Sequence, residues 1–175
     1  MVADTARFGS LILEVVQGDI TRQPDMDAIV NAANAQLAPG AGVCGAIHRA
    51  AGPGLAAACR EIGGCPTGEA RITPGFKLPA RWIIHTVGPV WHGGGSGEAE
   101  KLRSAYRSSL ELARERGIKS IAFPGISTGV YGYPKEEAAR VGLTVMREYE
   151  DKFDEIIACC FSAGDRALYE KLLTG

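Results

Sequence analysis

The sequence contains no apolar run close to the ~18 residues that a membrane-spanning helix needs. Residues 1–10 also lack a basic segment followed by an apolar core, so we expect no signal peptide and interpret them as a flexible N-terminal tail. The chain has 175 residues, of which 46% are hydrophobic and 22% charged. This composition favours one folded domain, which we place at residues 11–175.

An excess of positive charge is also missing, because the formal net charge is −1. The sequence therefore does not favour a broad basic surface for nucleic-acid backbones or for a membrane. Any anion must be held by local geometry, such as backbone N–H groups. We expect a monomer without a cofactor.

The five cysteines include no C-x-x-C pair, which removes the usual signature of a zinc site. Cys159 and Cys160 are adjacent in a strand-like run, so their side chains should point to opposite faces of a sheet. We expect reduced thiols, a cytoplasmic protein and no bound metal.

Three histidines remain as candidate ligands or bases. His85 lies between apolar residues of a strand-like run and is interpreted as a hydrogen-bonded core residue. His48 lies in a helical stretch and is expected to brace the loop before it. His92 precedes a run of glycines and is expected to face solvent.

Strand-like and helical runs alternate along the chain. The strand-like runs are residues 11–17, 28–33, 69–73, 82–87, 118–124 and 155–161. The helical runs are residues 43–62, interrupted at 52–54, then 98–116, a segment opened by Pro134, and 165–173. This order predicts right-handed β-α-β units and a largely parallel sheet covered on both faces, with some antiparallel pairing among the early strands.

Two glycine-rich turns follow strands of this sheet, at residues 39–47 and 125–132. Ligands bind beyond the carboxyl ends of the strands in open α/β sheets. Glycines let the backbone approach a ligand and direct several N–H groups at one anion, and a helix N-terminus adds positive potential. Two such turns at one edge suit a diphosphate, with Ser127 and Thr128 as further donors. The alternative is that the glycines only make tight turns.

The spacing Gly40-x-Gly42-x-x-Gly45 matches the dinucleotide fingerprint literally. However, residues 34–39 separate the first glycine from its strand, and the nearest acidic candidate, Glu61, lies in a helical stretch. Neither turn carries the Lys-Ser/Thr of a P-loop. A nicotinamide-dependent oxidoreductase or a nucleotidase is therefore a poor fit.

Several long motifs resemble the macrodomain family, and in particular its MacroD-type branch. They are residues 18–21 (GDIT), 27–34 (DAIVNAAN), 45–52 (GAIHRAAG), 64–70 (GCPTGEA), 84–91 (IHTVGPVW) and 121–134 (IAFPGISTGVYGYP). The similarity runs from about residue 13 to residue 173. It implies a three-layer α/β/α sandwich around a mixed, mostly parallel six-stranded sheet that binds ADP-ribose.

The resemblance also assigns roles at the adenosine end. Asp19 would accept the adenine amino group, the backbone N–H of Ile20 would bind the adenine ring, and Phe161 would stack on it. Two of these residues have simpler alternatives, because Asp19 could cap the turn at Thr21 and Phe161 could be ordinary core.

The two glycine turns would hold the phosphates and the distal ribose. Asn34 would bind a distal ribose hydroxyl, while Asn31 is expected to fix the local backbone. Asn34, Gly129 and Tyr131 would carry the catalytic positioning. The further ligand-binding residues are Gly42, Val43, Cys44, Gly45, Ser127, Thr128 and Val130.

Cys44 departs from the family, which carries an aspartate at this position to activate a water near the distal ribose. A thiol at a helix N-terminus can have a lowered pKa, but a neighbouring diphosphate opposes that shift. The simpler alternative is that Cys44 only packs. In this family the attacking water can also be activated by the substrate's own phosphate, so we expect reduced turnover.

The resemblance implies hydrolysis of ester-linked ADP-ribose, on Asp or Glu side chains of proteins or in O-acetyl-ADP-ribose. The expected partners are ADP-ribose and ADP-ribosylated proteins, with ADP-ribosylated nucleic-acid ends left open. A reader that binds ADP-ribose without turnover, and a thiol-based sensor or nucleophile at Cys44, stay as alternatives.

Overall fold

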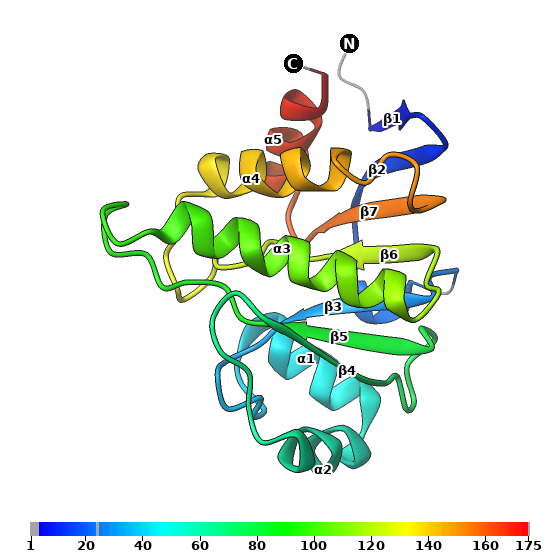
Figure 1. Cartoon of the computed structure of the whole chain (residues 1–175), viewed down its shortest axis with the longest axis vertical. Coiled ribbons are helices and arrows are strands. Elements are labelled where there is room, and N and C mark those ends of the chain that lie inside the picture. The colour runs from blue at the N-terminus through cyan, green and yellow to red at the C-terminus, as the bar shows by residue number, and fades with distance from the viewer. Residues whose placement is uncertain (1–3, 24, 175) are drawn as a thin grey trace.

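A seven-stranded mixed sheet forms the middle layer of the protein in the computed structural model, which describes residues 4–23 and 25–174 (Figure 1). The strand order is β1-β2-β7-β6-β3-β5-β4. The strands are β1 (Thr5–Phe8), β2 (Leu11–Gln17), β3 (Ala28–Ala32), β4 (Ala70–Pro74), β5 (Trp82–Thr86), β6 (Ser120–Phe123) and β7 (Glu155–Cys160). Only the outer pairs, β1 with β2 and β4 with β5, are antiparallel. The expected α/β sandwich with a mostly parallel sheet is confirmed.

The sheet has one strand more than expected, because part of the presumed tail is ordered. Residues 5–8 pair with β2 in antiparallel register, so the prediction of a flexible tail over residues 1–10 is wrong for this stretch. The physical reason is partial burial: Ala6 and Phe8 pack against the core, and the guanidinium of Arg147 lies 4.5 Å from the Phe8 ring. Residues 1–3 lie outside the described residues.

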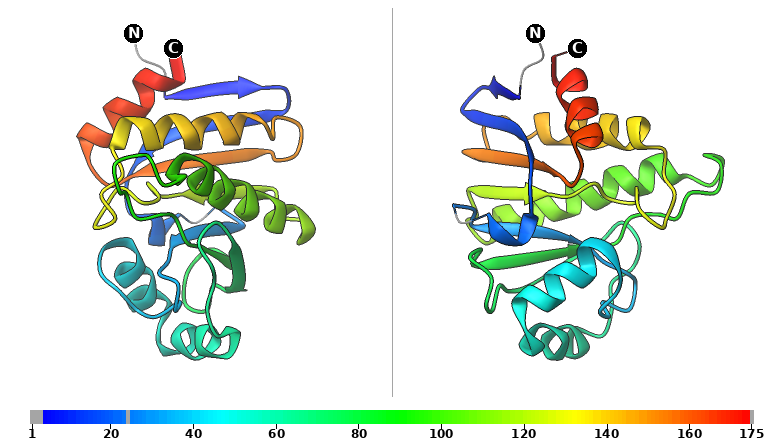
Figure 2. Two further views of the ribbon diagram at one scale, coloured as in Figure 1. Left: turned by 60° about the vertical axis from the view of Figure 1, so that its left-hand side comes forward. Right: turned by 180° about the vertical axis from the view of Figure 1, so that it is seen from behind.

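Helices cover both faces of the sheet (Figure 2). The helices α3 (Glu98–Glu115), α4 (Lys135–Arg147) and α5 (Ala163–Thr174) cover one face. The other face is covered by the 3-10 turn η1 (Ile20–Arg22) and by α1 (Gly42–Ala51) and α2 (Pro53–Ile62). No helix within residues 4–23 and 25–174 is long and apolar enough to cross a membrane.

Alternation along β7 separates the two cores. Cys160 belongs to the core under α3–α5, whereas Cys159 belongs to the core under α1 and α2. The expectation that these cysteines point to opposite faces is confirmed, and all five cysteines are free thiols.

Candidate functional site

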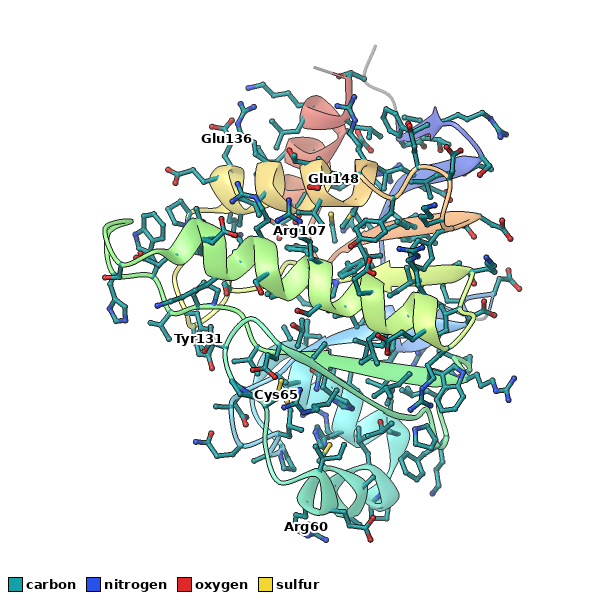
Figure 3. The ribbon with its side chains drawn as sticks, viewed as in Figure 1. Arg60, Cys65, Arg107, Tyr131, Glu136 and Glu148 are labelled. Atoms are coloured by element: carbon teal, nitrogen blue, oxygen red, sulfur yellow. The ribbon has the colours of Figure 1, made fainter. Side chains whose placement is uncertain are left out.

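The carboxyl ends of β2, β3, β6 and β7 lie at one edge of the sheet, which we call the rim. The parallel pairing brings together four segments that are distant in sequence. Figure 3 labels Tyr131 on the loop that leaves β6 at this edge. The segments are residues 18–20, the first loop (residues 34–45), the second loop (residues 125–132) and residue 161.

Asp19 and Phe161 are neighbours at the end of paired strands. Gln17 pairs with Cys160, and the N–H of Gly18 donates to the carbonyl of Cys160 at 3.0 Å. Phe161 is 87% exposed, so the alternative that it is ordinary core is wrong. An exposed aromatic ring and a carboxylate thus follow the ends of two paired strands, and a planar, polar ligand could cover the ring.

The carboxylate of Asp19 caps η1. Its Oδ1 accepts the N–H of Thr21 at 2.9 Å and the hydroxyl of Thr21 at 2.6 Å. These bonds, with a smaller contribution from Arg22, lower the pKa of Asp19. Its Oδ2 lies 3.6 Å from Nε of Arg22 and takes no hydrogen bond from the described residues. The capping role is therefore real, and it leaves one oxygen free to accept.

The first loop ends in a helix N-terminus without a side-chain cap. The residue before α1, Ala41, contributes no side-chain hydrogen bond, so the first N–H groups of α1 remain available to an anion. Gly42 has φ 60°, which favours glycine. Gly45 has no room for a Cβ because the carbonyl of Gly40 occupies that space.

Asn34 is held rigidly within the first loop. Its Nδ2 donates to the carbonyl of Ala38 at 2.9 Å, and its Oδ1 accepts the N–H of Ala38 at 2.9 Å. An amide has two N–H groups and two lone pairs, so one donor and one acceptor position remain. Asn34 is thus oriented in advance and still able to bind a hydroxyl.

Cys44 lies in the first turn of α1, at the end of the first loop, and is buried at 6% exposure. Its thiol donates to the carbonyl of Ala38 at 3.5 Å and accepts from Nδ2 of Asn31 at 3.8 Å. Burial raises the pKa of the Cys44 thiol, although the bond from Asn31 opposes this. The group is a protonated thiol at neutral pH, which disfavours the alternative of a thiolate nucleophile or sensor.

The second loop stores backbone strain at Ser127. This residue has φ 67°, which is uncommon outside glycine, and its buried Oγ has no partner among the described residues. The hydroxyl of Thr128 donates to the carbonyl of Gly125 at 3.2 Å. Val130, at the tip, is 94% exposed. The loop is therefore ordered, but one of its polar groups lacks a partner.

Two of the predictions for the histidines are confirmed. His85 is fully buried and hydrogen-bonded on both ring nitrogens, and His92 is exposed. His48 borders the first loop beside Pro39 and Gly40, but its buried Nε2 makes no hydrogen bond to the described residues. Within the described part of the chain, no cluster of potential ligands could hold a metal ion.

A buried carboxylate that the sequence analysis missed holds the loop of residues 92–97, which precedes α3. Glu98, 1% exposed, accepts backbone N–H groups of His92 at 2.8 Å, Gly94 at 2.9 Å and Ser96 at 2.7 Å. The residue just before the loop of residues 92–97 is joined to the second loop, because the N–H of Trp91 donates to the carbonyl of Tyr131 at 2.8 Å.

The bonds to Glu98, that from His92 first, lower its pKa from 4.5 to about 2. A lowered pKa stabilises the fold fully above about pH 4.5, and this stabilisation is lost as the pH falls towards 2. Glu98→Gln should therefore unfold more easily at neutral pH, with a difference from the wild type that shrinks below pH 4.5. Urea unfolding at several pH values measures this. Glu115→Gln on the same helix is the control, and equal pH dependence of Glu98→Gln and wild type would contradict the prediction.

The sequence model of the Macro domain family matches residues 30–142. A macro domain-containing protein of Chlorobaculum tepidum is 56% identical over 167 residues, which cover 94% of this chain and 96% of that protein. An O-acetyl-ADP-ribose deacetylase of Klebsiella pneumoniae is 51% identical, covering 91% of this chain and 95% of the relative.

Solved structures agree with these sequence matches. A variant of the Oceanobacillus iheyensis macrodomain with ADPR superimposes with a TM-score of 0.93 at 43% identity, covering 97% of this chain and 96% of that one. Together with the rim geometry, these similarities establish that the chain belongs to the Macro domain family.

Proposed function

We propose that this protein binds ADP-ribose along the rim and hydrolyses ester-linked ADP-ribose. The observation that carries the proposal is the common edge: an exposed ring and a carboxylate lie at one end, and two loops rich in backbone N–H groups lie beside them. The solved macrodomain with ADPR and the deacetylase of Klebsiella pneumoniae support it as relatives.

Adenine lies between Asp19 and Phe161 in this proposal. The free Oδ2 of Asp19 accepts the adenine amino group, and the ring of Phe161 stacks on the base. The backbone N–H of Ile20 donates to a ring nitrogen. Stacking would also remove the exposed ring of Phe161 from water.

The diphosphate lies between the two loops. Backbone N–H groups at the start of α1, over residues 42–44, and in the second loop, over residues 127–131, donate to its oxygens, while Gly45 lets the chain come close. This arrangement fits a chain whose net charge is only −1, because the donors are main-chain groups. The orphan Oγ of Ser127 would gain a partner on binding.

The distal ribose and the attacking water lie near Asn34, Gly129 and Tyr131. Asn34 uses its remaining donor and acceptor for ribose hydroxyls. The substrate's phosphate takes a proton from the water as the water oxygen bonds to the ester carbonyl carbon. The acyl C–O bond then breaks, and the phosphate passes the proton to the ribose oxygen that leaves, which gives ADP-ribose and a free carboxylic acid. The substrates are proteins that carry ADP-ribose on Asp or Glu, and O-acetyl-ADP-ribose.

The buried, protonated Cys44 favours a second candidate function, a reader that binds ADP-ribose without turnover. A thiol cannot replace the carboxylate base found at this position in the MacroD-type pattern. A general base typically contributes about 10²–10⁴-fold to the rate of turnover. Without that base, the proposed hydrolase relies on the positioning of the substrate and the water, and its turnover is correspondingly slower.

Release of ADP-ribose from a glutamate-linked ADP-ribosylated protein separates the two functions. We expect slow release by the wild type, largely retained in Cys44→Ala and Cys44→Ser, and release about 10²-fold faster in Cys44→Asp. Calorimetry measures ADP-ribose binding in parallel. Tight binding with no release by the wild type would establish the reader, and complete loss of release in Cys44→Ala would point to the thiol.

A further inference from the structure

A line of buried polar side chains runs from β4 through β5 and β3 to the first loop. Thr73, His85 and Asn31 are 2%, 0% and 1% exposed. Oγ1 of Thr73 lies 3.0 Å from Nε2 of His85, and Nδ1 of His85 lies 3.0 Å from Nδ2 of Asn31. Such a network is costly to bury unless its members are matched as donors and acceptors.

The direction of these hydrogen bonds follows from the far end. The hydroxyl of Thr73 donates its one proton to the carbonyl of Pro74 at 3.1 Å, so it accepts from His85. His85 therefore carries its proton on Nε2, and its Nδ1 accepts from the amide of Asn31. Burial lowers the pKa of His85 to about 4, which keeps the ring neutral at physiological pH.

This direction leaves Asn31 with one further N–H, and that N–H faces position 44. Nδ2 of Asn31 lies 3.8 Å from Sγ of Cys44, whose thiol donates to the carbonyl of Ala38 at 3.5 Å. The same carbonyl accepts from Asn34 at 2.9 Å. The line of bonds therefore ends at the turn that orients Asn34.

We propose that Asn31, held by His85 and Thr73, is a positioning residue that presents a hydrogen-bond donor to the side chain at position 44. This inference rests on the proposed function for its effect on turnover, and on the geometry alone for its existence. The sulfur of a thiol accepts only a weak hydrogen bond from this donor, whereas a carboxylate would accept a strong, charge-assisted one. The donor would therefore suit the aspartate that the MacroD-type pattern has at this position, where this chain has Cys44.

The proton position on His85 tests the network without any substrate. Nitrogen-15 NMR distinguishes protonated from unprotonated ring nitrogens, and the chain has only three histidines to assign. We expect a neutral His85 with the proton on Nε2 in the wild type and in Thr73→Ser, which keeps the hydroxyl. Thr73→Val, of nearly equal volume, removes the acceptor of the Nε2 proton. The proton should then move to Nδ1 and donate to Oδ1 of Asn31, which has no partner among the described residues, as the amide of Asn31 turns over. A proton on Nδ1 in the wild type would overturn the proposal.

A double-mutant cycle between positions 31 and 44 tests the effect on turnover. In the presence of Asn31 we expect Cys44→Asp to speed release about 10²-fold, and with Asn31→Ala the same change should gain only about tenfold. The acid limb of the pH–rate profile should also move to higher pH, because the introduced carboxylate loses its donor. Equal gains in both backgrounds, with no shift of the limb, would overturn the positioning role.

The two tests separate the proposals. If no variant releases ADP-ribose, the proposed hydrolysis fails, while the proton position on His85 still decides whether the network is built as inferred. If release occurs but the proton lies on Nδ1, the hydrolase stands and the positioning role of Asn31 fails.

Discussion

Gly88→Ala is expected to weaken ADP-ribose binding by about 100-fold while the protein stays folded. A Cβ on residue 88 would overlap Oγ of Ser127 and lie 2.6 Å from Cγ2 of Ile126. Ser127 is already at φ 67°, so the second loop has little room to yield locally. We expect Ser127 to shift away from its ligand-binding position, so that the overpacking cost of about 1–3 kcal/mol is seen as lost affinity. A loss of about 2.8 kcal/mol in binding free energy corresponds to 100-fold in affinity. Calorimetric titration with ADP-ribose measures the change.

Two further variants make this result specific. Gly95→Ala changes a glycine with no neighbour within 4 Å of an added Cβ and should bind as the wild type does. Adding Ser127→Gly to Gly88→Ala removes the overlap with the hydroxyl and should restore part of the affinity. Undiminished binding by Gly88→Ala would show that the second loop does not hold the ligand.

Asp19→Ala is expected to reduce the affinity for ADP-ribose by about 1.5–3 kcal/mol, the range for a hydrogen bond to a charged group. The free Oδ2 of Asp19 is the proposed acceptor for the adenine amino group. The same change also removes the two bonds that Thr21 makes to Oδ1. Affinity therefore has to be measured together with unfolding.

Two comparisons separate the lost ligand contact from the lost cap. Thr21→Val removes the hydroxyl bond to Asp19 and leaves the carboxylate, so it should affect stability more than affinity. The hypoxanthine analogue of ADP-ribose lacks the amino group, so Asp19→Ala should cost little affinity for this ligand. An equal loss for both ligands would place adenine elsewhere.

The strand and helix runs were predictable because their periodicity is local. Ile156 and Ile157 alternate between two cores, as a strand buried on both faces requires. The two glycine turns were also predictable, because glycine permits positive φ and close approach of the backbone, and its clusters are visible in the sequence.

The rest depended on contacts between distant segments. Residues 5–8 carry no strong strand signal, and they are ordered only because β2 and the core accept them. Glu98 resembles an ordinary acidic residue at the start of a helix, yet the preceding loop folds around it. The line from Thr73 to Asn31 joins three strands, and no pattern within one strand reveals it.

The two outermost strands limit how this sheet can associate with another protein. β1 has four residues and β4 has five, and each runs antiparallel to the one strand that it pairs with among the described residues. Pro74 lies at the end of β4, and Arg7 and Arg71 place charges on the two borders. Short, charged or proline-terminated borders are poor templates for another chain to extend by strand pairing. The fold thereby resists the intermolecular β-addition that begins aggregation.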